Sequence, residues 1–365
     1  MLKCIGLTST PTAANEMRKD YLVDRWTVIA TQRKKRPVDF KRAPEEKKQA
    51  GVCSLEPGNE HMTPPAVLVY LSANGGIKKD RDADGLRHKD WLVRCVPNLY
   101  PAFTPPTKGE RMSSVESAFV LDRATGHHEV LVESPNHDEH PGTACIPQLV
   151  HVVNAQIDRL RELSSKPYVK YVSIFRNHGL EAGASLSHAH TQIIATPFMP
   201  KMVKEELKAS EESFKKENHC AFCSIVENEE KSTRFVWKNN DYVVFAPWAS
   251  LHPFEFWIFP KKHQCCLLDL SQLQVESLAR TMRVCFGALK SLLNDPPYNY
   301  GFHQITQGAC DHFHWHLEVY PRLSIWAGFE KSTGMFINVV SPEDAAANLR
   351  EATQEEEKKL SAIQG

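Results

Sequence analysis

The chain has 365 residues, 42% of them hydrophobic, which is long enough for two domains and apolar enough to fill substantial cores. Its 44 basic and 44 acidic residues cancel, so no global charge favours binding to nucleic acid or to a membrane surface. No run of about 20 apolar residues predicts a transmembrane helix. The composition therefore favours small-molecule chemistry.

The chain contains ten cysteines and no apolar signal segment. This usage predicts thiols and metal ligands in a reducing, cytoplasmic compartment. Seven cysteines lie outside any motif and are expected to be ordinary thiols: Cys4, Cys95, Cys145, Cys265, Cys266, Cys285 and Cys310.

The secondary structure expected from the sequence alternates simply. Residues 1–19 hold several Ser and Thr but only one arginine, Arg18, so they predict a flexible extension in preference to an organelle-targeting peptide. Apolar residues at helical spacing predict long helices over 147–163 and 270–293, and Ser341 followed by proline and two acids predicts the start of a terminal helix. Strands are expected where β-branched and aromatic residues gather, at 26–30, 129–133, 171–175, 242–245 and 254–259.

The order of these elements repeats along the chain. Each repeat has strands, one long helix and a further strand, which predicts an α+β fold of two tandem halves, each an antiparallel sheet with a helix packed on it. We place the first half at 20–200 and the second at 201–350, followed by a charged tail at 351–365.

One motif carries most of the chemistry. His188 and His190 are two residues apart in a β-rich segment, so their side chains are expected on the same face of a strand. The preceding Gly183-Ala184-Ser185 leaves room for the backbone to approach an anion closely. Together these features indicate a histidine that acts on a phosphate.

A second copy of the motif lies downstream in the same register. His314 and His316 repeat the spacing, and 51 residues separate His263 from His314, as 51 residues separate His137 from His188. Cysteines precede both copies, Cys53 in the first and the pair Cys220 and Cys223 in the second. The register predicts a duplicated half in which a cysteine hairpin, a distant histidine and a His-x-His strand meet.

At this level of detail the chain resembles the galactose-1-phosphate uridylyltransferase family of the histidine-triad superfamily, over about residues 20 to 350. A plant branch with ADP-glucose phosphorylase activity resembles it equally well. The resemblance rests on blocks at 24–26, 33–40, 57–65, 98–102, 175–197, 294–300 and 328–334.

The resemblance implies a mechanism and its residues. His190 would be the nucleophile that holds the nucleotidyl group, and Gln192 would donate an amide hydrogen bond to a phosphoryl oxygen. A glutamine at this position, where hydrolases of the superfamily have a third histidine, is consistent with transfer to a sugar phosphate in preference to water. Ser185 and the backbone around Gly183 would cradle the phosphates, and Asn177 would contact the nucleotide.

The substrate contacts further from the motif are also implied by the family. Arg33 and Arg36 would lie near the nucleotide, where guanidinium groups suit phosphate oxygens, and Asn98 would contact it as well. Glu330 and Gly334 match a block that forms the hexose-phosphate site, in a neighbouring subunit of a homodimer. The sugar-contacting glutamine of the better-known enzymes is absent from residues 331–334.

Two metal sites are predicted, giving one or two Zn²⁺ per chain. In the second half, two thiols and two imidazoles suit tetrahedral zinc: Cys220, Cys223, His263 and His314. Glu206 and His316 offer a different set with the same two histidines, resembling a carboxylate–histidine site of some family members. The first half offers Cys53, Glu56, His137 and His188, with Glu56 where the family usually has a second cysteine.

Several functions stay open at this stage. The main interpretation is UMP transfer from UDP-glucose to galactose 1-phosphate through a covalent intermediate, and the alternative is ADP-glucose phosphorylase activity with phosphate as acceptor. A zinc-stabilised nucleotide-binding module is a rival of another class. A hydrolase that uses the second half is a further rival, but the register aligns Glu318 with Gln192 and would put a carboxylate beside the phosphate.

Overall fold

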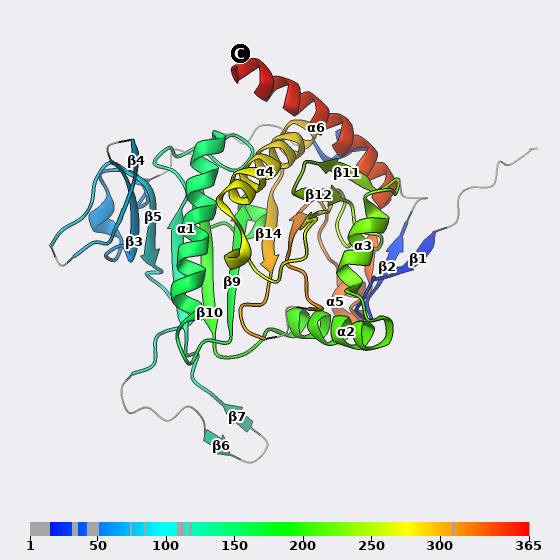
Figure 1. Ribbon diagram of the computed structural model, residues 1–365, viewed down its shortest axis with the longest axis horizontal. Helices are drawn as coiled ribbons and strands as arrows, with labels where there is room; N and C mark the ends of the chain where they lie inside the picture. The colour runs from blue at the N-terminus through cyan, green and yellow to red at the C-terminus, as the bar shows by residue number, and fades with distance from the viewer. Residues whose placement is uncertain are drawn as a thin grey trace, which may run out of the picture.

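The computed structural model describes residues 15–30, 36–41, 51–73, 75–83, 85–107, 114–116, 119–308 and 311–364. Its centre is one sheet of eleven antiparallel strands in the order β11-β12-β13-β15-β14-β9-β10-β8-β5-β3-β4 (Figure 1). The strands from the first half are β3 (Leu68–Ala73), β4 (Gly76–Asp80), β5 (Trp91–Pro97), β8 (His127–Val132), β9 (Tyr171–His178) and β10 (His190–Thr196). Those from the second half are β11 (Phe235–Lys238), β12 (Tyr242–Phe245), β13 (Phe256–Pro260), β14 (Tyr298–His303) and β15 (His316–Pro321).

The two halves meet where β9 pairs with β14. This pairing is antiparallel and places Arg176 opposite Tyr300 and Asn177 opposite Asn299. Counting outward from the junction, β10 and β15 are the next strands on either side. The two His-x-His motifs therefore lead into equivalent strands, as the duplicated register predicts.

Two long helices, α1 (Ile146–Ser164) and α4 (Gln272–Leu293), pack against each other across one face of the sheet (Figure 1). Both carry apolar residues at helical spacing, and Leu160 and Leu289 are almost fully buried in the core. Ser271 caps α4, because its hydroxyl accepts from the Gln274 N–H at 3.3 Å while the Gln274 side chain accepts from the Ser271 N–H at 3.1 Å.

The terminal helix α6 (Pro342–Gln364) packs on α4, where Arg283 pairs with Glu356 at 2.6 Å. Ser341 begins this helix as expected, since its hydroxyl accepts from the Asp344 N–H at 3.1 Å. The segment predicted as a charged tail from residue 351 is thus a continuation of α6, with Leu360 buried.

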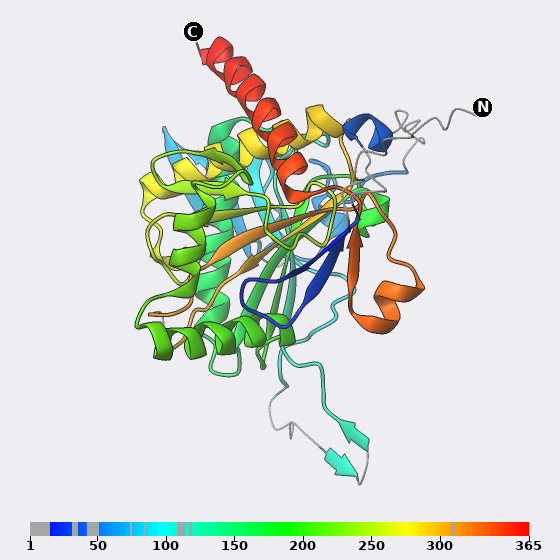
Figure 2. The same ribbon diagram turned by 90° about the vertical axis from the view of Figure 1, so that its right-hand side faces the viewer.

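Smaller elements surround this body. They are the helices α2 (Lys201–Glu217), α3 (Ala221–Glu229) and α5 (Gly328–Thr333); the 3-10 turns Pro37–Phe40, Glu60–Met62, Leu180–Ala182 and Leu267–Asp269; the strands β1 (Glu16–Lys19), β2 (Trp26–Ile29) and β16 (Phe336–Asn338) of a second sheet; and the hairpin of β6 (Ser114–Glu116) and β7 (Phe119–Leu121). Figure 2 shows the hairpin projecting away from the main body.

The α+β class with a duplicated antiparallel architecture and one long helix per half is confirmed. The structure adds that the halves share one sheet, and that β2 pairs in parallel with β16, so residues 16–29 assemble with the second half. Residues 16–19 form β1, although the sequence predicts a flexible extension there; residues 1–14 lie outside the described residues. The sequence prediction also lacked α2 and α3.

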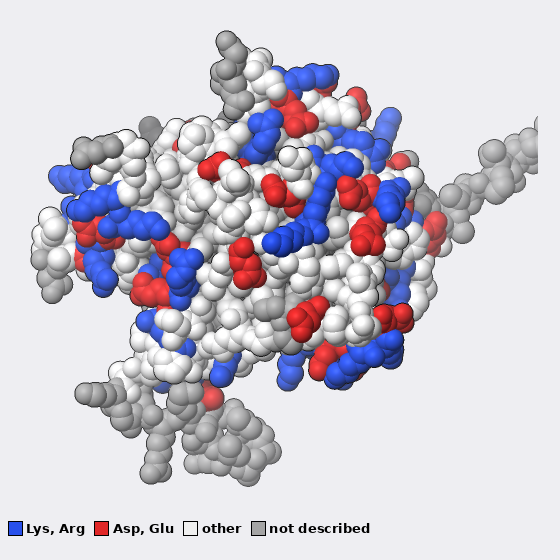
Figure 3. Space-filling view, in the orientation of Figure 1, with Lys and Arg blue, Asp and Glu red and all other residues white. Residues whose placement is uncertain are grey.

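The surface agrees with the balanced composition. Lys and Arg lie among Asp and Glu over the face in Figure 3, and neither sign dominates it. Within the described residues, no helix combines the length and apolar character that crossing a membrane requires.

The packing of α4 gives a first prediction. Leu289→Ala should lower the free energy of unfolding by about 2–5 kcal/mol, because it opens a cavity between the helices and the sheet. Leu273 lies on the same helix but is 75% exposed, so Leu273→Ala should change the stability by less than about 0.5 kcal/mol. Urea unfolding of both variants checks this, and equal losses would contradict the assigned core.

Candidate active site and metal centres

His190 opens β10 near the middle of the large sheet, and its side chain is 6% exposed. Its Nδ1 lies 2.8 Å from the carbonyl oxygen of His188. A carbonyl can only accept, so Nδ1 carries the proton and Nε2 keeps the lone pair. The backbone itself thus selects the tautomer that a nucleophilic Nε2 requires.

The surroundings of His190 favour its neutral form. Burial lowers the pKa of this imidazole, and the positive charge of Arg176 lowers it further. A neutral ring is the form that has a nucleophilic lone pair near pH 7.

A buried polar network holds the strand that carries His190. Arg176 pairs with Glu133 at 2.5 Å, and the Thr191 hydroxyl donates to the same carboxylate at 2.6 Å. Tyr300 of β14 reaches Thr191 at 3.1 Å. Because Thr191 precedes Gln192 and follows His190, this network fixes β10 from the face opposite the two predicted catalytic side chains.

Gln192 is half-buried on the same face of β10 as His190. Its Oε1 lies 2.8 Å from Nε2 of His128, a half-buried residue of β8, and Asn98 Nδ2 lies 3.1 Å from the same nitrogen. The structure therefore brings together Gln192 and Asn98, both predicted to contact substrate, through a histidine that the sequence prediction did not include.

The other predicted contacts near the motif lie at the end of β9 and in the turn and loop that follow it. Asn177 accepts from Asn299 Nδ2 at 2.8 Å, and Gly183 lies beside it, with 4.0 Å between Asn177 Nδ2 and the position that a Cβ on Gly183 would take. Gly183 has φ +84°, which favours glycine in the turn before β10. Ser185 is exposed in the loop between this turn and His190.

The structure places the remaining predicted contacts elsewhere. Arg36 lines a cavity of about 540 Å³ together with residues of α4 and α6, which cover the helical face of the large sheet. Glu330 lies on α5 and Gly334 is its C-cap; α5 packs near β16 and lies apart from β10, which carries His190 and Gln192 (Figure 1). Arg33 lies outside the described residues.

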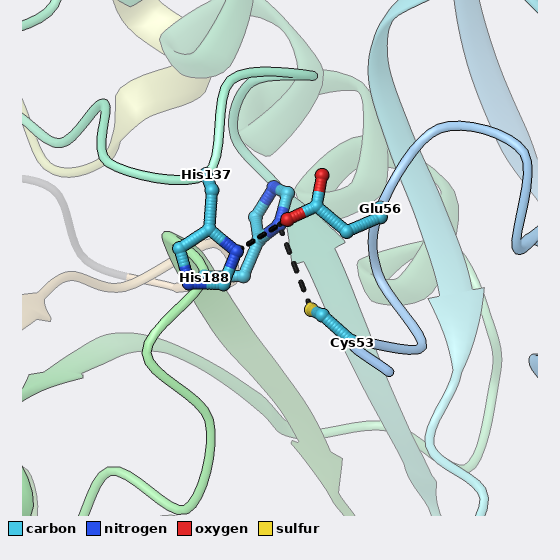
Figure 4. Close-up of side chains that lie close together, drawn as sticks. All are labelled: Cys53, Glu56, His137 and His188. Atoms are coloured by element: carbon cyan, nitrogen blue, oxygen red, sulfur yellow. Dashed lines mark hydrogen bonds and ion pairs between the residues drawn. The ribbon is translucent and has the colours of Figure 1, made fainter. Parts of the chain in front are cut away.

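The first predicted metal set converges. Figure 4 shows Cys53, Glu56, His137 and His188 pointing toward one another, and their four ligand atoms lie within 4.8 Å of each other. His188 Nδ1 is 3.8 Å from Cys53 Sγ and 3.7 Å from Glu56 Oε1. Tetrahedral zinc ligands are separated by roughly 3.3–3.8 Å, so these two spacings suit a metal. His137 Nδ1 and Glu56 Oε1 lie closer, at 2.5 Å, and form a hydrogen bond with each other.

The far nitrogens of both histidines in this set have their own partners. His188 Nε2 lies 2.8 Å from the Ser134 carbonyl, and His137 Nε2 lies 2.8 Å from the Ser187 hydroxyl. The carbonyl fixes the proton of His188 on Nε2, which leaves Nδ1 free to bind a cation.

The second predicted set also converges. Cys220, Cys223 and His263 form one group of potential ligands, and His314 Nδ1 lies 3.7 Å from Cys223 Sγ. A hydrogen bond with Cys223 lowers the pKa of the Cys220 thiol, and a weaker effect of His263 lowers it further. Burial lowers the pKa of His314 to about 3. A thiolate and neutral imidazoles are the forms that bind zinc.

Glu206 and His316 do not join His263 and His314, contrary to the alternative metal set considered from the sequence. They cluster with His303 and Glu318, residues that the alternative set did not contain. Burial opposes a charge on His303, but Glu206 and Glu318 raise its pKa to about 9. Ion pairs between histidines and carboxylates therefore hold this buried group together.

His316 shows how the second copy differs from the first. Its Nδ1 faces the His314 carbonyl at 3.1 Å, as in the first half, but its Nε2 lies 3.2 Å from the Glu318 carboxylate. The ring is 1% exposed and stacks on Phe259. In the second half, the nitrogen equivalent to Nε2 of His190 thus faces a carboxylate.

The cysteines outside the metal sets are mostly thiols, as expected. Cys95, Cys145, Cys266 and Cys285 are free. Cys265 is disulfide-bonded, which corrects its prediction as a thiol, because sequence spacing does not reveal which sulfurs meet. Cys4 and Cys310 lie outside the described residues.

The fold and the paired His-x-His strands define a duplicated protein of the histidine-triad superfamily. A family model described as "Domain of unknown function (DUF4921)" matches residues 132–363. ADP-glucose phosphorylase from Arabidopsis thaliana is 30% identical and covers 93% of both chains, and galactose-1-phosphate uridylyltransferase from Thermotoga maritima is 28% identical, covering 93% of this chain and 99% of its own.

Solved structures agree with these sequence relatives. The crystal structure of the Arabidopsis thaliana ADP-glucose phosphorylase with bound ADP-glucose has a TM-score of 0.74 at 27% identity, over 93% of this chain and 99% of that one. The chain belongs to the galactose-1-phosphate uridylyltransferase family, in which it matches the DUF4921 domain, and it is a nucleotidyltransferase.

The two ligand sets give a prediction about metal content. Purified protein should contain more than zero and at most about two zinc ions per chain, and the Cys220 set should resist chelators longer than the Glu56 set, because thiolates bind zinc more tightly than a carboxylate does. Cys223→Ser should lower the zinc content and the melting temperature. Cys145→Ser, at an exposed thiol, is the control and should leave both unchanged; elemental analysis that finds no metal in protein made with zinc would refute the sites.

Proposed function

We propose that this enzyme transfers UMP from UDP-glucose to a hexose 1-phosphate through a covalent nucleotidyl-His190 intermediate. The proposed hexose 1-phosphate is galactose 1-phosphate. The observation that carries the proposal is the contrast between the two copies: Nε2 of His190 keeps its lone pair, whereas Nε2 of His316 faces a carboxylate. A non-catalytic module would not require this difference between the halves.

The reaction would run as two in-line displacements. In the first, Nε2 of His190 attacks the α-phosphorus, the N–P bond forms, and the P–O bond to the β-phosphate breaks, so that glucose 1-phosphate leaves with the electron pair. The resulting ring cation keeps its Nδ1–H on the His188 carbonyl. In the second, a phosphate oxygen of galactose 1-phosphate attacks the same phosphorus, and the N–P bond breaks to release UDP-galactose and neutral His190.

Gln192 would stabilise the charge that develops on the nonbridging oxygens, because its NH₂ group donates without being acidic. Ser185 and the backbone at Gly183 would hold the phosphates, and Asn177 and Asn98 would contact the nucleotide. Arg33 and Arg36 would contact the nucleotide, as the family resemblance implies, although within this chain Arg36 lies at the cavity beside α4 and α6.

A second candidate is ADP-glucose phosphorylase activity, with AMP as the transferred group and phosphate as the acceptor. Two observations favour it: the 30% identity to the Arabidopsis thaliana enzyme and the absence of glutamine from residues 331–334. UDP-glucose and ADP-glucose, each assayed with galactose 1-phosphate and with inorganic phosphate, separate the two candidates. The productive pair identifies the activity.

We assign zinc to both cysteine–histidine sets, in a structural role. The first would be held by Cys53, Glu56, His137 and His188, and the second by Cys220, Cys223, His263 and His314. Zinc would supply a fixed crosslink among these residues and no chemistry to the transfer. Binding at His188 would anchor the carbonyl that holds the His190 proton.

We further propose a homodimer in which Glu330 and Gly334 complete the hexose-phosphate site of the partner subunit. Their segment carries exposed apolar side chains that suit an interface, with Ile325 92% and Phe329 45% exposed. Their separation from His190 within one chain also supports a contribution to another subunit.

The covalent step gives a direct prediction. A nucleotide sugar with radiolabelled α-phosphate should label the wild-type protein and leave His190→Ala unlabelled, because the variant lacks the nitrogen that forms the N–P bond. His316→Asn keeps an amide donor toward the His314 carbonyl and should still be labelled. Circular dichroism of both variants controls for folding, and equal labelling of wild type and His190→Ala would remove the assignment.

The kinetic order gives another prediction. Initial rates against both substrates should form the parallel reciprocal lines of a ping-pong mechanism, with slow hydrolysis when no acceptor is present. Gln192→Glu should reduce transfer by about 100-fold or more, since a carboxylate repels the phosphoryl oxygens that the amide would stabilise. Gln192→Ala, which removes the donor without adding charge, should lose less activity; intersecting lines would rule out the intermediate.

A further inference from the structure

His128 is a histidine of β8 that the sequence motifs do not mark. It lies opposite Ile194 in the β8–β10 pairing, and Gln192 lies opposite Val130, so His128 and Gln192 are diagonal neighbours on one face of the sheet. This face is the one that carries His190. The position gives His128 access to the side chain proposed to stabilise the phosphoryl group.

A backbone group fixes the tautomer of His128. The N–H of Ala102 lies 3.1 Å from His128 Nδ1 and can only donate, so Nδ1 must offer its lone pair. The proton of the ring is therefore on Nε2.

The Nε2–H then determines the orientation of Gln192. The nearest acceptor is the Gln192 oxygen Oε1 at 2.8 Å. Once that oxygen accepts from His128, the NH₂ of the same carboxamide must point the other way. No hydrogen bond between described residues uses this NH₂, so it is available to a ligand.

Asn98 is a second neighbour of His128 Nε2. Its Oδ1 accepts from the Tyr100 N–H at 2.9 Å, and its Nδ2 lies 3.1 Å from His128 Nε2. Asn98 Nδ2 is a donor and cannot accept the Nε2 proton, so Gln192 Oε1 is the acceptor for this proton among the described residues.

We propose that His128 is a positioning residue for nucleotidyl transfer: it holds the Gln192 amide with NH₂ directed at the phosphoryl oxygen. An amide free to turn would present its oxygen to the phosphate for part of the time, and two negative oxygens would then repel each other. This inference rests on the proposed function for the reaction, but the hydrogen bond itself exists without substrate.

The first test is kinetic. His128→Phe keeps the size of the ring and removes its donor, and it should slow single-turnover nucleotidylation of His190 about 10- to 100-fold, with a change in KM of less than about threefold. His128→Gln restores an N–H donor at similar reach and should recover most of the rate. His127→Phe is the matched control: His127 points to the opposite face and contacts Tyr168 at 2.8 Å, so its loss should leave the rate near that of wild type.

A double-mutant cycle tests whether His128 acts through Gln192. In the Gln192→Ala background, His128→Phe should cause no further loss, because the amide that it positions is gone. If the rate of the double variant falls by the product of the two single-variant losses, the proposal is overturned. A His128→Gln variant that is no faster than His128→Phe would overturn it too. Thermal melting of each variant separates these results from loss of the fold.

The second test needs no activity. In protein labelled with ¹⁵N at histidine and glutamine, the histidine signals that disappear in His128→Phe should show protonated Nε2 and unprotonated Nδ1, and the Gln192 side-chain NH₂ resonances should shift in that variant. The opposite tautomer would overturn the proposal even if transfer is established. If no nucleotide sugar labels His190, the proposed function fails while the spectrum still decides whether this hydrogen bond exists.

Discussion

The antiparallel pairing of β9 with β14 is the contact on which the rest of the molecule depends. It joins the strands of both halves into a single sheet, and it places Tyr300 of the second half against Thr191 and the Arg176–Glu133 ion pair of the first. Breaking a buried ion pair by removing one partner typically costs about 3–5 kcal/mol. The strand carrying His190, the proposed nucleophile, is thus held by groups from both halves.

The divergence of the two copies follows from a few side chains around a shared geometry. In both, the second histidine of the motif faces the carbonyl of the first, which places the proton on Nδ1. Beyond that ring the halves differ, with an amide at Gln192 and a carboxylate at Glu318. His316 also packs against Phe259, which makes this ring part of the core.

Periodicity, spacing and the 51-residue register predicted the two halves, the long helices α1 and α4, and the grouping of both metal sets. Three features of the structure could not be predicted from the sequence. The single sheet depends on which edge strands meet, and no local pattern in β9 or β14 specifies that. The regrouping of Glu206 with His303 depends on α2, which was not predicted. His128 is one of two adjacent histidines in a strand, and only the Ala102 N–H, 26 residues away in the chain, distinguishes it.

The symmetry of the central junction also bears on how such a chain could arise. Since β9 and β14 are equivalent strands running antiparallel, two copies of one half would pair about the same twofold axis as an isologous dimer. Fusing the genes for those copies frees one site to change while the other keeps working. The same junction makes it unfavourable to separate the halves. Either half alone would expose β9 or β14 as a long edge strand, which is a template for pairing with other chains.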